Sequence, residues 1–205
     1  FIFKTARASG KVLFETEDLV IGYDSPLSKP LNLRMERGEK IALTGANGIG
    51  KTTLLKSILG LTAPYSGRAL LGDYLYPGYF EQEMSGDMTR TCIQAIWDCF
   101  PSMTQYEVRS ALAKCGLTTK HIESQLRVLS GGEQAKVRLC KILNTQTNFL
   151  LLDEPTNHLD ADAKAELKRA LQSYSGSILL ICHEPDFYKD VVEKVIDCME
   201  WSLKL

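Results

Sequence analysis

The stretch Gly45-Ala-Asn-Gly-Ile-Gly-Lys-Thr52 decides how the rest of the sequence is interpreted. It matches the pattern G-x-x-x-x-G-K-[ST], and it lies between a short apolar segment and a segment from Lys51 to about Leu59 that we expect to be helical. Its glycines let backbone N–H groups point inward at phosphate oxygens, and the start of the following helix adds a positive dipole end. The stretch therefore predicts a phosphate-binding loop, in which Lys51 reaches the β- and γ-phosphates of a nucleotide and the Thr52 hydroxyl ligates Mg²⁺.

A second decisive stretch, 149–160, reads FLLLDEPTNHLD and ends an apolar run with two adjacent acids. Burying carboxylates at such a place is costly unless something compensates their charge. A metal-bound nucleotide opposite them would do so. We therefore expect Asp153 to hold Mg²⁺, directly or through water, and Glu154 to polarise an attacking water molecule.

Two unbroken apolar runs, Phe149–Leu152 and Ile178–Ile181, predict parallel strands that are covered on both faces. A helical pattern lies between them, from about Ala161 to Tyr174. A strand, a helix and a second strand at this spacing are typical of a right-handed crossover in an α/β sheet.

The first part of the chain has a different pattern. Residues 31–36 alternate strictly between apolar and polar, Lys40–Thr44 is short and mostly apolar, and 12–23 is strand-like but less regular. Together these segments suggest a small antiparallel sheet near the start. Residues 102–116 are predicted to be helical, with Gly116 as the stop.

The stretch Leu129-Ser-Gly-Gly-Glu-Gln134 has the form of a helix start. Ser130 and Glu133 fit a capping box, in which each residue satisfies a backbone N–H of the other. A helical stripe follows, at Ala135, Leu139 and Ile142. These residues alone leave two interpretations open, a well-capped structural helix or an anion site at its start.

The order of these motifs narrows the interpretation, because LSGGEQ between a phosphate loop and an Asp-Glu pair resembles the ATP-binding cassette (ABC) family. The resemblance runs across nearly the whole chain, so residues 1–205 are expected to form a single ABC ATP-binding domain. It implies an α/β fold: an ABC-type P-loop NTPase core with a mixed or parallel sheet, a small N-terminal antiparallel β subdomain and a short α-helical subdomain at about 84–143. It also implies an ATPase that uses ATP and Mg²⁺.

The resemblance assigns roles to individual residues. Tyr23, upstream of the loop, would stack on adenine; Gln82 would sense Mg²⁺ and the attacking water; His183 would contact the γ-phosphate. Catalysis would then depend on Glu154, His183 and Lys51, and the metal would be held by Thr52, Gln82 and Asp153. The implied nucleotide-binding set is Tyr23, Gly45, Ala46, Asn47, Gly48, Ile49, Gly50, Lys51, Thr52 and Thr53.

In that family the signature stretch serves the nucleotide of the opposite cassette. Ser130, Gly131, Gly132 and Glu133 would therefore close a site whose phosphate loop lies on a second cassette, and Asp160 would contact that partner. This implies a head-to-tail pair with two ATP molecules between the cassettes. A lone cassette is expected to bind ATP but to hydrolyse it poorly.

Three features favour one branch of the family. The Thr-Asn-His-Leu-Asp form of 156–160 is similar to the F branch (ABC-F), whose soluble members join two cassettes and act on the ribosome, whereas transporter cassettes more often carry Ser and Ala at 157 and 158. The segment from Lys51 to Ser130 is short for a subdomain that grips a membrane partner, and the basic lead-in Phe3–Lys11 resembles the start of a second F-branch cassette. The alternatives are the motor subunit of an ABC membrane transporter, bound to a permease, and a regulatory nucleotide-binding module. Intact Glu154 and His183 argue against the last of these.

Bulk composition sets weaker limits. With 44% hydrophobic and 24% charged residues and a net charge of −1, the chain is ordinary for a soluble domain and shows no strongly basic or acidic bias, so ribosome contact rests on the resemblance alone. The sequence also bears on membrane and targeting segments. No apolar run is long enough to span a bilayer, and we expect no signal peptide. The absence of a C-x-x-C pair argues against a zinc site. The even number of cysteines would allow disulfides, but the chain is large enough to have its own core, which favours free thiols in a reducing, cytoplasmic compartment. Because the first residue is Phe1 rather than methionine, we expect a segment of a longer protein.

Overall fold

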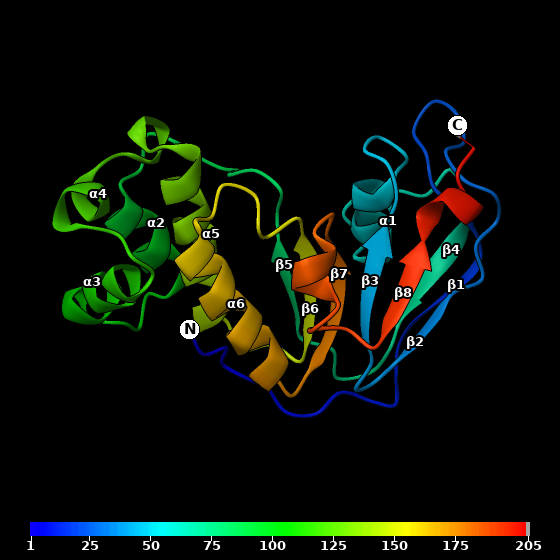
Figure 1. The fold of residues 1–205 in the computed structure, drawn as a ribbon, viewed down its shortest axis with the longest axis horizontal. Helices are drawn as coiled ribbons and strands as arrows, with labels where there is room; N and C mark the ends of the chain where they lie inside the picture. Colours follow the sequence, from blue (N-terminus) through cyan, green and yellow to red (C-terminus); the bar gives the residue numbers. More distant parts are fainter. Residues whose placement is uncertain (204–205) are drawn as a thin grey trace.

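The computed structural model describes residues 1–203, which form two sheets flanked by helices (Figure 1). The larger sheet has five parallel strands in the order β5-β6-β7-β3-β8. Their bounds are Pro77–Phe80 for β5, Phe149–Asp153 for β6, Ser177–Ile181 for β7, Lys40–Thr44 for β3 and Lys194–Asp197 for β8. The prediction of two adjacent buried strands is confirmed, because β6 and β7 pair in parallel and every residue of both is buried.

The smaller sheet is antiparallel and has the order β2-β1-β4, with bounds Arg34–Glu36, Val12–Val20 and Ser66–Leu71. The prediction that Lys40–Thr44 belongs to this sheet was wrong. Three consecutive residues of that segment, 41–43, are buried, and a strand that is covered on both faces suits the parallel sheet, where it pairs with β7 and β8. The third antiparallel strand is β4 instead.

The expected strand at 31–36 is also shorter than predicted. Leu31 pairs with Leu19 as a single bridge, and regular pairing begins only at Arg34. Between them, Asn32 donates a hydrogen bond to the Asp18 carboxylate at 3.0 Å, and Asp18 has a φ of 45°. This left-handed residue interrupts the ladder of β1 and explains why strict alternation did not produce one continuous strand.

Helices gather on both sides of the parallel sheet. Helices α2 to α5 lie at one end of the molecule and the antiparallel sheet at the other, while α1 follows β3 (Figure 1). The α-helices are α1 Lys51–Ile58, α2 Cys92–Cys99, α3 Gln105–Lys114, α4 Thr119–Glu123, α5 Gly131–Asn144, α6 Ala161–Ser173 and α7 Pro185–Tyr188; the 3₁₀ turns are η1 Leu126–Val128 and η2 Cys198–Glu200. The helix predicted at 102–116 begins at Gln105 because the Thr104 side chain caps it, and it stops where expected, before Gly116 with φ 91°.

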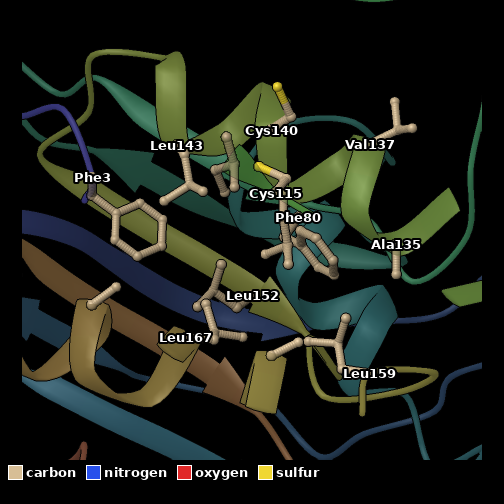
Figure 2. Packing of buried hydrophobic residues seen from close by; sticks show 14 of the residues in the cluster. Phe3, Phe80, Cys115, Ala135, Val137, Cys140, Leu143, Leu152, Leu159 and Leu167 are labelled. Atoms are coloured by element: carbon tan, nitrogen blue, oxygen red, sulfur yellow. The ribbon is translucent and has the colours of Figure 1, made fainter. Parts of the chain in front are cut away.

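The parallel sheet separates two hydrophobic clusters. Along β6, Phe149 and Leu151 belong to the cluster beside α1 and the antiparallel sheet, whereas Leu150 and Leu152 belong to the cluster beside α5 and α6. Figure 2 shows the latter cluster, where Leu152 lies near Leu167 of α6. Burying each such side chain contributes about 1.5–3 kcal/mol, so this division accounts for the unbroken apolar runs.

Candidate functional site

A cavity of about 510 Å³ lies at the carboxyl ends of β3, β6 and β7. Ligands of parallel α/β sheets bind at this edge, because strand ends and helix starts meet there. The cavity collects predicted residues from distant parts of the chain: Tyr23, Asn47, Gly48, Gly50, Lys51, Thr52, Thr53, Gln82, Asp153 and Glu154. Four others complete its wall: Asp24, Ser25, Leu27 and Ile181.

The loop between β3 and α1 needs its glycines. Gly45, Gly48 and Gly50 have φ values of 133°, 80° and 108°, which L-residues rarely adopt. A Cβ on Gly45 would lie 2.6 Å from Cδ1 of Ile49. The Ile49 side chain is buried in the hydrophobic cluster that contains α1, so it anchors the loop and does not line the cavity. Gly45 and Ala46 do not line it either.

Lys51 lies inside this loop. Its Nζ donates hydrogen bonds to the carbonyl of Gly45 and, at 3.3 Å, to the carbonyl of Ala46. Burial lowers the pKa of Lys51, and the nearby carboxylates of Glu154 and Asp153 oppose that shift. The Lys51 ammonium group is thus held by two carbonyls of the loop, near the two acids.

Asp153 carries the clearest mark of a metal site. The Thr52 hydroxyl donates to its Oδ2 at 2.6 Å, whereas its Oδ1 is buried and has no hydrogen-bond partner among residues 1–203. The residue is 1% exposed, and burial raises the pKa of its carboxyl group, against the effect of the Thr52 hydrogen bond. A hydroxyl and one carboxylate oxygen without a donor suit Mg²⁺, which takes one or two carboxylates together with phosphate oxygens and water. Gln82 is exposed and lines the same cavity.

Glu154 is held on several sides. It is 8% exposed, has a φ of 48°, and its backbone N–H donates to the carbonyl of Ile181 at 2.9 Å. The Nδ2 of Asn157 donates to its Oε2 at 2.7 Å, and Nε2 of His183 contacts its Oε1. His183 therefore lies next to Glu154 but is not part of the cavity wall. The contact between Asn157 and Glu154 was not predicted from the sequence, where its one signal was the position of Asn157 three residues after Glu154.

The capping box at the start of α5 is confirmed. Ser130 Oγ accepts from the Glu133 N–H at 3.2 Å, and Glu133 Oε2 accepts from the Ser130 N–H at 3.1 Å. The Ser130 hydroxyl also donates to Oε2 of Glu133, and this bond, with that from the Ser130 N–H, holds the pKa of Glu133 below its ordinary value. Nε2 of His121 lies 3.0 Å from the other carboxylate oxygen. None of the residues 130–133 lines the cavity of its own cassette.

Two further predicted residues have the following positions. Asp160 caps α6, accepting from the Ala163 N–H at 2.8 Å, so it has a local structural role in addition to the predicted contact with a partner cassette. Tyr23 is 62% exposed and forms part of the cavity wall, and its stacking on adenine stays a prediction.

Two bulk features complete the description. Across residues 1–203, no helix combines the length and the apolar character that crossing a membrane requires. The thiols of the described chain are all free; Cys99 is exposed and the others, Cys92, Cys115, Cys140, Cys182 and Cys198, are buried.

Comparisons with known proteins agree with this geometry. A family model for ABC transporters matches residues 28–157. The uncharacterized ABC transporter ATP-binding protein YfmM of Bacillus subtilis is 68% identical over 205 residues, which cover 100% of this chain and 40% of that protein. ABC transporter F family member 5 of Arabidopsis thaliana is 35% identical over 206 residues, covering 98% of this chain and 30% of that protein. The chain thus spans 30% to 40% of the length of these relatives.

Solved structures show the same fold. The ATP-binding cassette MJ0796, in a dimeric post-hydrolysis state bound to ADP and Pi, matches with a TM-score of 0.76 at 18% identity, covering 90% of this chain and 94% of that one. The expected fold class, an ABC-type P-loop core, is therefore confirmed. From the family match, the F-family relatives and the fold, this chain belongs to the ABC transporter family, as an ATP-binding cassette.

Proposed function

We propose that this cassette binds and hydrolyses MgATP in a head-to-tail pair with a second cassette, within a cytoplasmic, ribosome-associated factor of the ABC-F branch. One observation carries the proposal for the chemistry. The Thr52 hydroxyl, the buried Asp153 carboxylate and Glu154 line one cavity together with the glycine loop and Lys51. A buried acid pair beside a phosphate loop is the arrangement that MgATP hydrolysis requires, and the transporter alternative would use it in the same way.

The residues divide the work in the following way. The loop amides and Lys51 bind the β- and γ-phosphates and stabilise the charge that develops on them during transfer. Thr52, Asp153 and Gln82 would hold Mg²⁺, which supplies charge neutralisation on the phosphates when bound. Glu154 accepts a hydrogen bond from the attacking water and orients it, while His183 lies beside Glu154 to contact the γ-phosphate.

Pairing with a second cassette is supported by the position of the signature stretch 130–133 outside the cavity wall. Ser130 and the two glycines after it start α5 and are not in the wall of this cavity. A signature that does not serve its own nucleotide is free to serve that of a partner, with Asp160 near the contact. Binding of ATP would then close the pair and hydrolysis would open it.

The F-branch assignment is supported by the relatives that carry that name and by the Asn157-His158 pair. The length of these relatives leaves room for a second cassette outside the present chain, since this chain covers 30% of each.

The catalytic proposal is tested with Glu154→Gln in the full-length protein. We expect ATP binding to persist and turnover to fall by about 10²–10⁴-fold, the usual contribution of a general base. Glu166→Gln, an exposed acid on α6, is the matched control and should keep the activity of the parent protein. Unchanged turnover in Glu154→Gln would overturn the role of Glu154.

The partner is tested by sedimentation of the native protein with ATP. Glu154→Gln should accumulate closed pairs that migrate with ribosomes. Migration with membranes and a permease would instead establish the transporter alternative and reject the ribosome.

A further inference from the structure

We propose that Asn157 is a positioning residue that fixes the carboxylate of Glu154, and that His158 ties the same turn to the start of α5. The inference rests on the proposed role of Glu154 in orienting water. It concerns two adjacent residues that the family resemblance used only to separate branches.

The turn from Glu154 to Asn157 is closed by two hydrogen bonds between its first and last residues. The Asn157 backbone N–H donates to the Glu154 carbonyl at 3.1 Å, and the Asn157 side chain donates to Oε2 of Glu154 at 2.7 Å. Glu154 has a φ of 48°, a left-handed conformation that non-glycine residues keep only when the surroundings determine it. Asn157 provides such a determinant from within the turn.

Each oxygen of the Glu154 carboxylate has its own partner. Asn157 holds Oε2, and His183 contacts Oε1 from the end of the neighbouring strand. A carboxylate held at both oxygens has one orientation, and a general base acts efficiently only when its position relative to the water is fixed. An amide suits this task because it donates a hydrogen bond without adding charge beside Lys51 and the acids.

The chemistry at position 157 is selective. Leucine has nearly the same shape but no donor, aspartate would place a like charge against Glu154, and serine is too short to reach Oε2 from the same backbone position.

His158 anchors the other side of the turn. It also has a positive φ, 65°, and its ring packs on Gly131, where a Cβ would lie 3.2 Å from Nδ1. A Cβ on Gly132 would lie 2.8 Å from the His158 carbonyl oxygen. The next residue, Leu159, is buried in the cluster shown in Figure 2. The turn is therefore fixed between Glu154 and the first turn of α5, so the position of the carboxylate and that of the signature helix are linked within one cassette.

The test compares Asn157→Leu with Asn32→Leu in the full-length protein. Asn32 is a matched control because its Nδ2 also donates to a carboxylate, that of Asp18 at 3.0 Å, and neither residue lines the cavity. We expect Asn157→Leu to lower kcat for ATP by about 10–100-fold while KM stays within about twofold, since a displacement near 1 Å can cost that much. Asn32→Leu should change neither quantity.

Two further measurements separate positioning from a merely structural effect. In a Glu154→Gln background, Asn157→Leu should lower the residual turnover no further, because the group that it positions is already gone. In the protein without nucleotide, backbone amide exchange at 154–158 should become faster in Asn157→Leu and remain unchanged in Asn32→Leu. Asn157→Ser should also lower kcat, because its hydroxyl is too short to reach Oε2, and it keeps the inference testable if the leucine variant does not fold.

The outcomes distinguish this inference from the proposed function. If Glu154→Gln retains turnover, the proposed function fails. If Glu154→Gln abolishes turnover but Asn157→Leu and Asn157→Ser retain full kcat, or if their effects add to that of Glu154→Gln, only the positioning role of Asn157 is overturned.

Discussion

Replacing Gly132 by alanine should destabilise the protein even though alanine is the better helix former. Gly132 is the second residue of α5, and a Cβ there would lie 2.8 Å from the backbone carbonyl oxygen of His158. An ordinary contact of this kind is longer by about half an ångström or more. The carbonyl cannot simply turn away, because His158 has a left-handed φ and Leu159 behind it is buried.

The magnitude follows from two opposing effects. Overpacking that moves the backbone costs about 1–3 kcal/mol, whereas exchanging glycine for alanine in a helix gains up to about 1 kcal/mol. The net loss in the free energy of unfolding should therefore be about 1 kcal/mol. At Gly131 the nearest atom is Nδ1 of the His158 ring, at 3.2 Å, and that exposed side chain can turn aside. Gly131→Ala should thus be neutral or slightly stabilising.

The assay is thermal unfolding of both variants and the parent, without nucleotide. For a domain of this size about 1 kcal/mol corresponds to roughly 2–4 °C in Tm, so Gly132→Ala should melt lower than Gly131→Ala by at least that margin. Equal melting temperatures, or a more stable Gly132→Ala, would refute the contact between the turn and α5 on which the reasoning depends.

Three other predictions concern the acid pair and the core. Burial raises the folded-state pKa of Asp153 above its unfolded value, so the ionised carboxylate lowers the stability of the folded protein at neutral pH. Without nucleotide, Asp153→Asn should therefore raise Tm at pH 7.5, and this gain should shrink as the pH falls towards 4. The same variant should lose the increase in Tm that MgATP gives. A gain that grows in acid would contradict this sign. Thr52→Val removes a donor from a buried carboxylate and should cost about 1–3 kcal/mol in chemical denaturation while weakening Mg²⁺-dependent ATP binding, whereas Thr52→Ser should preserve both. Leu180→Ala, at a fully buried position of β7, should cost about 2–5 kcal/mol, against less than about 0.5 kcal/mol for the exposed Leu70→Ala; similar losses in the two would contradict the assigned core.

The elements that the sequence predicted well are those with strong local determinants. The phosphate loop has glycines that few other arrangements require, and β6 and β7 are apolar on both faces, so their burial could be recognised without knowing their neighbours. The capping box of α5 is also local, since both of its hydrogen bonds join residues three positions apart.

The remaining elements depend on contacts between distant segments. Lys40–Thr44 is too short for its pattern to distinguish a parallel from an antiparallel partner, and only its pairing with β7 and β8 decides. The edge strands β5 and β8 were missed because each has four residues and exposed positions. The role of Asn157 depends on where the side chain of Glu154 points, which a turn sequence does not specify.

The alternation of the two clusters along β6 has a consequence for how the molecule responds to change. Neighbouring residues of this strand pack on opposite sides of the sheet. Leu150 and Leu152 pack in the cluster beside α5 and α6. Phe149 and Leu151 pack in the cluster beside the phosphate loop. A substitution at Leu150 or Leu152 can thus change the position of α5, whereas one at Leu151 changes the packing below the phosphate loop. The strand that ends in the acid pair thus separates the two clusters. The side chains of one cluster can change in sequence without changing those of the other, as long as the strand keeps its register.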